Sequence, residues 1–209
     1  FRRHFPYQEV PRAPAAWAPA LDMLRDSPEV REVILSGGDP LTESDQRLAG
    51  LWHELERITH VQTLRIHTRL PIFIPRRVTD ALLNRLATSR FRVVIVIHAN
   101  HARELDGEVV ESLVRLRAAG ALLLNQSVLL HGVNDSVAAL VDLSDRLLAC
   151  GVLPYYLHQL DRVHGAAHFE VTEERGRQLI EAMRIRLPGY AVPRYVREIA
   201  GQPHKTVLE

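Results

Sequence analysis

The sequence is almost without lysine. Of its 26 lysine and arginine residues, only Lys205 is a lysine. Arginine is a poor amine nucleophile, because its guanidinium group stays protonated far above neutral pH. Lys205 is therefore the one side chain suited to amine chemistry such as Schiff-base formation. A genome biased towards arginine codons, with one lysine left by chance, would give the same composition.

Cysteine, long apolar runs and net charge are scarce as well. The single cysteine, Cys150, excludes an internal disulfide and fits a reducing cytoplasm. It ends the run Leu147-Leu148-Ala149-Cys150, which indicates the buried face of a helix rather than a reactive site. No stretch has the pattern of a signal peptide or the length of a membrane span. The formal net charge of +1 provides no strong field for nucleic acid or an anionic membrane, so we expect a cytoplasmic protein without either partner.

Short apolar runs alternate with helical patterns along the chain. The apolar runs predict strands at 32–35, 63–67, 92–97, 122–128 and 153–157. Between and after them, helices are predicted at 45–58, 79–87, 107–119, 137–149 and 172–187. This alternation is typical of α/β proteins with a parallel sheet covered by helices on at least one face. No repeat or linker divides the sequence, so we expect residues 1–209 to form a single domain.

Polar residues gather where the predicted strands end. Ser36-Gly37-Gly38-Asp39-Pro40 follows the first strand and His67-Thr68-Arg69 ends the second. Similar groups occur at His98, at Gln126 and at 158–161. A (β/α) barrel builds its active site at the carboxyl ends of its strands. The sequence therefore predicts an enzyme on a full or partial barrel.

These motifs also have simpler interpretations. Gly-Gly and Asp-Pro are common turn dipeptides, although two consecutive glycines also let a ligand approach the backbone closely. The histidines at 98, 101, 158, 164 and 168 do not have convincing zinc-ligand spacing. Hydrogen-bonding roles in a polar pocket are favoured over a metal site made by protein side chains alone.

Several segments together resemble one enzyme family. They are Phe1-Arg2-Arg3-His4-Phe5, residues 34–41, residues 125–135, residues 158–169 and residues 197–206. The first is similar to the segment that directly follows the CxxxCxxC motif of the lysine 2,3-aminomutase group, and the second to its adenosylmethionine-binding motif. These are radical S-adenosylmethionine enzymes that also carry pyridoxal phosphate. The last two segments look most like the branch that β-lysylates elongation factor P.

The resemblance implies a fold and cofactor sites. The fold would be a partial (β/α)6 radical-SAM type barrel of parallel strands with outer helices. Lys205, in the carboxyl-terminal segment 188–209, would hold pyridoxal 5'-phosphate through its amine. Residues Gly201-Gln202-Pro203-His204 replace a stretch that is richer in glycine in other members, which changes the loop but keeps the amine. The S-adenosyl-L-methionine ligands would be Ser36, Gly37, Gly38 and Asp39, with His98 and Gln126 near the same molecule.

The resemblance also implies a substrate site for L-α-lysine. Arg2 matches the arginine that pairs with the substrate carboxylate, a task suited to a planar bidentate donor. Asp161 and Glu198 match the two acidic positions that hold the ε-ammonium group, where two anions balance one buried cation. For Glu198 alone, a surface ion pair with Arg197 or Arg194 is the simpler interpretation.

The reaction implied is the conversion of L-α-lysine to β-lysine by a radical 1,2-amino shift, an isomerisation that would serve elongation factor P modification. Besides the two organic cofactors it would use a [4Fe-4S] cluster. Its partners would be lysine, a reductant such as flavodoxin or ferredoxin, and elongation factor P with its lysyl-transferring ligase.

The cysteines that would hold the cluster are absent, and Cys150 alone cannot replace them. Since the chain starts at Phe1 without an initiator methionine, we expect a fragment that lacks the cluster motif and first strand and is inactive alone. Two rival interpretations stay open. A non-radical pyridoxal phosphate enzyme would need Lys205 but not residues 36–39. A non-catalytic remnant that binds lysine or elongation factor P would keep Arg2, Asp161 and Glu198.

Overall fold

In a computed structural model, which describes residues 17–209, the chain forms two compact units. The first extends to Val96 and includes Arg115–Leu122; the second comprises Ile97–Val114 and Leu123–Glu209. The helix α5 (Gly107–Ala118) contributes residues to both. Strands and helices alternate as the sequence predicts, so the α/β class is confirmed. A single domain over the whole chain stays a prediction.

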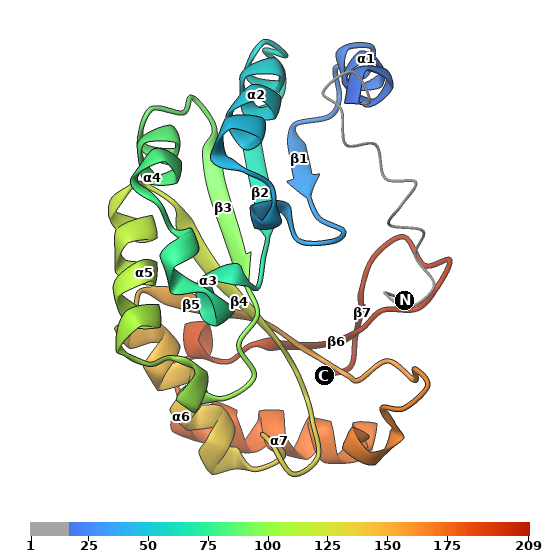
Figure 1. Cartoon of the computed structure of the whole chain (residues 1–209). Helices are drawn as coiled ribbons and strands as arrows, with labels where there is room; N and C mark the ends of the chain where they lie inside the picture. Colours follow the sequence, from blue (N-terminus) through green and yellow to red (C-terminus); the bar gives the residue numbers. More distant parts are fainter. Residues whose placement is uncertain (1–16) are drawn as a thin grey trace. The chain divides into compact units, whose positions relative to one another are not determined.

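The first unit contains three parallel strands in chain order, β1 (Glu32–Leu35), β2 (Thr63–His67) and β3 (Arg92–Ile97) (Figure 1). Each has the bounds predicted from its apolar run. The helices are α1 (Ala18–Arg25), α2 (Asp45–Glu56), α3 (Leu70–Phe73) and α4 (Asp80–Ala87). The first and third of these helices were not predicted.

Caps and apolar faces explain where α2 and α4 begin and what they cover. The Ser44 hydroxyl accepts from the N–H of Arg47, and the Thr79 hydroxyl accepts from the N–H of Leu82. These bonds satisfy helix N–H groups that have no partner within the helix. Trp52 and other apolar side chains of both helices are buried and form much of the core of this unit.

The second unit contains the parallel strands β4 (Leu122–Val128), β5 (Val152–His158) and β6 (Arg194–Arg197). A short strand, β7 (Thr206–Val207), runs antiparallel to β6. The helices α6 (Val137–Ala149) and α7 (Glu173–Arg186) pack against each other (Figure 1). One-turn 3-10 helices occur in both units, at Pro40–Thr42, Pro75–Arg77, Ala102–Glu104, Ala167–Phe169 and Gly189–Ala191.

The core of the second unit includes a buried polar contact that joins its elements. The Tyr195 hydroxyl of β6 donates to the side chain of Gln159, whose amide donates to the carbonyl of Val171 at 2.7 Å. Tyr195 is fully buried, and its burial together with the charge of Glu173 raises the pKa of its hydroxyl to about 12. The contact therefore stays a neutral hydrogen bond at physiological pH.

Cys150 lies directly after α6 and is 1% exposed. Burial raises the pKa of its thiol, although Arg146 opposes the shift. A buried thiol with a raised pKa is a poor nucleophile and metal ligand. The predicted buried position of Cys150 is thus confirmed. None of the helices within residues 17–209 is long and apolar enough to cross a membrane.

Candidate functional site

The loop after β1 exposes backbone that a ligand can approach. Gly37 and Gly38 have φ values of 77° and 55°, in the left-handed region that favours glycine. A Cβ atom built on either residue would meet no atom of residues 17–209 within 4 Å. The glycines are therefore required by the backbone and leave open space above it, so the predicted adenosylmethionine loop fits a bound molecule.

Asp39 holds this loop in place. Its carboxylate accepts hydrogen bonds from the Thr68 hydroxyl at 2.7 Å, from the N–H of Arg69 at 2.7 Å and from the N–H of Leu41 at 3.0 Å. Both carboxylate oxygens are thus engaged by the chain itself. These bonds join the loop after β1 to the loop after β2, and direct contact of Asp39 with adenosylmethionine stays a prediction.

Sequence reasoning missed two residues that support the same loop. Thr68 is 1% exposed and is the side-chain donor to Asp39. Arg77 donates to the carbonyls of Leu41 and Glu43 at 2.6 and 2.9 Å, and pairs with Asp45. The position of Thr68 at a strand end was a signal for it, whereas nothing in the sequence distinguished Arg77 from the other arginines.

His98 and Gln126 lie together in the second unit. The side-chain amide nitrogen of Gln126 is 3.0 Å from Nε2 of His98. The amide donates to this ring nitrogen in the tautomer that leaves it unprotonated. The structure thus brings together two side chains that the family resemblance assigns to one ligand.

The asparagines of the 125–135 segment fix the backbone around this pair. Asn134 is fully buried and donates to the carbonyls of Asn100 and Val128, both at 2.9 Å. Asn125 bonds to both the N–H and the C=O of Ala99, at 2.8 and 3.0 Å. Such bonds satisfy buried backbone groups where the strands end, which gives this segment a structural role.

Asp161 and Glu198 line one pocket of about 480 Å³ in the second unit. The pocket is formed by Gln159, Leu160, Asp161, Arg162, Glu170, Val171, Thr172, Glu173, Arg197 and Glu198. Two of its acids are neutralised by arginine, in the pairs Arg162–Glu170 and Arg197–Glu173. Within residues 17–209, the Asp161 carboxylate has no hydrogen-bond or ion-pair partner. A carboxylate in this position can accept a cation from a ligand.

Lys205 lies just before β7 and contacts Glu198, one of these acids. Its Nζ donates to Oε2 of Glu198 at 2.7 Å, and the two side chains are 30% and 69% exposed, respectively. The hydrogen bond and charge of Lys205 lower the pKa of the Glu198 carboxyl, and His158 adds to the shift, while burial opposes it. The amine is accessible beside a pocket, so its surroundings fit an aldehyde cofactor. The simpler interpretation of Glu198 required an ion pair with Arg197 or Arg194, but Glu198 pairs with Lys205 and Arg197 pairs with Glu173.

An iron–sulfur cluster does not fit the residues of this chain. The only cysteine, Cys150, is buried at the carboxyl end of α6. No group of three or more His, Cys, Asp or Glu side chains in the described part of the chain could hold a metal ion. Cluster ligands would have to come from outside these 209 residues. Arg2, the predicted partner of the substrate carboxylate, lies outside the described residues.

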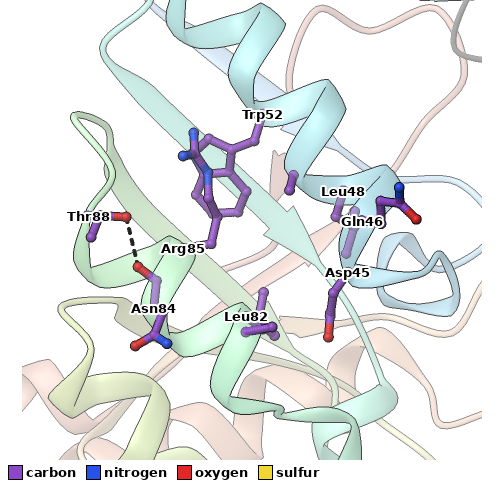
Figure 2. Close-up of a pocket in the computed structure, with 10 residues that line it drawn as sticks. Asp45, Gln46, Leu48, Trp52, Leu82, Asn84, Arg85 and Thr88 are labelled. Atoms are coloured by element: carbon purple, nitrogen blue, oxygen red, sulfur yellow. Dashed lines mark hydrogen bonds between the residues drawn. The ribbon is translucent and has the colours of Figure 1, made fainter.

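Another pocket, of about 360 Å³, lies between α2 and α4 of the first unit (Figure 2). Its floor is largely apolar, and the Arg85 guanidinium lies 5.5 Å from the centre of the Trp52 ring. Arg85 is paired with Glu56, and Asp45 with Arg77. No predicted site residue lines this pocket, so it is not the candidate site.

Curated proteins named L-lysine 2,3-aminomutase match the whole chain. The protein from Haemophilus influenzae is 49% identical over 207 residues, which are 99% of this chain and 61% of that protein. The Escherichia coli protein is 47% identical over 209 residues, 100% of this chain and 61% of that protein. The chain is a homologue of the lysine 2,3-aminomutases. It spans about three fifths of the length of these two aminomutases, and no family model matches it.

A more distant aminomutase also matches the chain, and two solved structures share its fold. The Clostridium subterminale aminomutase is 40% identical over 187 residues, covering 90% of this chain and 45% of that protein. A radical SAM methyltransferase from Sphaerobacter thermophilus matches with a TM-score of 0.60 at 21% identity, over 88% of this chain and 57% of that chain. Streptococcus suis SuiB matches with a TM-score of 0.65 at 14% identity, over 92% of this chain and 45% of that chain. The predicted family resemblance and the predicted radical-SAM type fold are therefore confirmed.

Proposed function

We propose that the chain is part of a lysine 2,3-aminomutase, an isomerase that converts L-α-lysine to β-lysine by a radical 1,2-amino shift. One observation carries the proposal beyond the names of the relatives. The only lysine of the chain, Lys205, lies 2.7 Å from Glu198, which lines the same pocket as Asp161. An amine for a cofactor and two acids for a substrate ammonium group are thus gathered in one unit.

Pyridoxal 5'-phosphate, S-adenosyl-L-methionine and a [4Fe-4S] cluster would supply the radical chemistry when bound. Lys205 would hold the first through its ε-nitrogen. Ser36, Gly37 and Gly38 would bind the second through exposed backbone and hydroxyl groups, with Asp39 keeping the loop in position. His98 and Gln126, which lie together in the second unit, stay predicted contacts of that molecule.

The substrate would be oriented through its charges. Asp161 and Glu198 would receive the ε-ammonium group of lysine, since Glu170 and Glu173 are already neutralised by Arg162 and Arg197. Arg2 would bind the carboxylate as a bidentate donor. Charge at both ends of the substrate would then fix the position of its carbon chain between them.

The proposal extends to the setting of the reaction. A cytoplasmic reductant such as flavodoxin or ferredoxin would reduce the cluster. The product would serve β-lysylation of elongation factor P through a lysyl-transferring ligase, which is supported by the resemblance of 158–169 and 197–206 to that branch.

The proposal is tested with the full open reading frame that contains these codons, expressed anaerobically with iron and sulfide. We expect β-lysine from L-lysine, loss of product in Lys205→Met, and a raised KM for lysine in Asp161→Asn. A cluster-loaded protein that makes no β-lysine would overturn the proposal. Imine formation at Lys205 without adenosylmethionine binding would indicate a non-radical pyridoxal phosphate enzyme, and failure to bind either cofactor a binding module.

A further inference from the structure

Lys205 and Glu198 form an ion pair with each other in the structure. The ammonium group of Lys205 donates to the Glu198 carboxylate at 2.7 Å. A protonated amine is not a nucleophile, and a carboxylate engaged by one ammonium group is less available to another. The pair therefore withholds two groups that the proposed function would use separately.

Glu198 differs in this respect from the other acids of its pocket. Glu170 and Glu173 pair with arginines, whose charge no reaction at neutral pH removes. The partner of Glu198 is the one cation that a carbonyl compound can convert to another group. The carboxylate of Asp161, which lines the same pocket, has no hydrogen-bond or ion-pair partner within residues 17–209.

We propose, resting on the proposed function, that Glu198 exchanges partners: it holds the Lys205 ammonium group in the protein without cofactor, and it receives the substrate ammonium group once Lys205 has reacted. In the reaction Lys205 loses a proton to solvent and its nitrogen attacks the aldehyde carbon of pyridoxal 5'-phosphate. A carbon–nitrogen double bond forms, and the carbonyl oxygen leaves as water. No oxidant or reductant is needed.

The exchange gives binding an order. Before Lys205 reacts, an entering ammonium group can pair with Asp161, whereas Glu198 is still engaged by Lys205. Afterwards it offers Asp161 and Glu198 together. A lysine substrate is therefore bound more tightly by the protein that already carries its cofactor, and more weakly by the protein without cofactor.

The first half of the exchange is tested by the rate at which pyridoxal 5'-phosphate forms an imine with the protein, followed by its absorbance. Glu198→Gln removes the ion pair, and we expect a rate about 1.5- to 5-fold higher, the effect of losing a partly exposed pair. Glu181→Gln is a matched control, because Glu181 is also exposed (68%, against 69% for Glu198) and also pairs with a cation, Arg184. An unchanged or lower rate in Glu198→Gln overturns the exchange.

The second half needs no cofactor, so it can fail independently of the proposed function. Lys205→Met frees Glu198, and we expect the affinity for n-butylammonium chloride, measured by NMR titration at constant ionic strength, to rise about 1.5- to 5-fold. The double variant Lys205→Met/Glu198→Gln is expected to lose that gain. Equal affinities in the parent and Lys205→Met proteins, including no binding by either, overturn the exchange. Absence of any imine at Lys205 instead overturns the proposed function.

Discussion

At the scale of single residues, arginine side chains support the main chain as well as carrying charge. Arg90 is the clearest case, because its guanidinium donates to backbone carbonyls at and just beyond the end of α2. The acceptors are Glu56 at 2.8 Å, Val61 at 2.7 Å, Ile58 at 2.7 Å and Leu55 at 3.3 Å. The last carbonyls of a helix have no partner within it and favour a nearby cation. Arg90 therefore completes the carboxyl end of α2.

Replacing Arg90 should destabilise the fold. We expect Arg90→Ala to lower the free energy of unfolding by about 1–3 kcal/mol, since it removes hydrogen bonds to partly buried carbonyls, of which those of Leu55 and Ile58 keep only a backbone donor. Arg57→Ala is the control, because Arg57 is 67% exposed and pairs only with Glu54 among the contacts described, and a change within about 0.5 kcal/mol is expected. Urea denaturation of both variants measures the difference. Equal losses would contradict a special role for Arg90.

At the scale of elements, the contact of α7 with β6 depends on a glycine. A Cβ atom on Gly176 would overlap the ring and hydroxyl of Tyr195, which is fully buried and bonded to Gln159. Movement of the ring away from α7 would disturb its hydrogen bond to Gln159. Helix and strand can approach this closely only while residue 176 has no side chain.

Two glycine-to-alanine changes in helices should have opposite signs. Gly176→Ala is expected to lower the free energy of unfolding by about 1–3 kcal/mol through overpacking. Gly50 lies in α2, where an added Cβ would meet none of the described atoms within 4 Å, so Gly50→Ala should raise the free energy of unfolding by about 0.5–1 kcal/mol. Thermal unfolding of the two variants is a direct comparison. A stabilised Gly176→Ala protein would show that α7 can move away from β6 without cost.

Elements with a strong apolar pattern could be predicted, and those defined by tertiary contacts could not. The runs at 32–35, 63–67, 92–97 and 122–128 became strands with the predicted bounds. Both β6 and β7 were missed, because Arg194–Arg197 has only two central apolar residues and Thr206–Val207 is a strand only through its pairing with β6.

The candidate site shows the same division. The grouping of Asp161 with Glu198 agrees with a prediction from the resemblance, but their roles in binding stay predictions. The ion pair of Glu198 with Lys205 could not be predicted, because it depends on the β6–β7 hairpin that brings the two residues together. Local sequence carries no signal for a contact created by an unpredicted element.

At the scale of the whole molecule, acidic groups are held by their partners and so couple stability to pH. Burial opposes ionisation of Glu56, but hydrogen bonds from Arg85 and Ser89 and the charge of Arg85 lower its pKa below the usual 4.5. Burial also opposes ionisation of Asp135, but backbone N–H groups and His131 lower the pKa of its carboxyl. The folded protein therefore binds protons at these groups less readily than the unfolded chain.

Stability should consequently fall in acid. Glu56 has its usual pKa of 4.5 in the unfolded chain, so the unfolded chain is protonated at this residue first as pH falls. The stabilisation from Glu56 is then lost as pH falls through the lowered pKa of the folded protein. We expect the urea midpoint to decrease over this range and to decrease less in Glu56→Gln. Glu29→Gln, at an exposed position, should keep the parent slope. Parallel pH profiles for the parent and Glu56→Gln proteins would contradict this linkage.

The base and the tip of the β6–β7 hairpin tolerate sequence change to different extents. Its base is held by the bond from the Leu208 N–H to the Tyr195 carbonyl at 2.9 Å and by Arg177, which donates to the carbonyl of Leu208 at 2.7 Å. The tip, residues 199–204, is exposed and includes Gly201 at a φ of 83°. Insertions and deletions can therefore accumulate at the tip across related sequences, while the spacing from Lys205 to Leu208 stays constant.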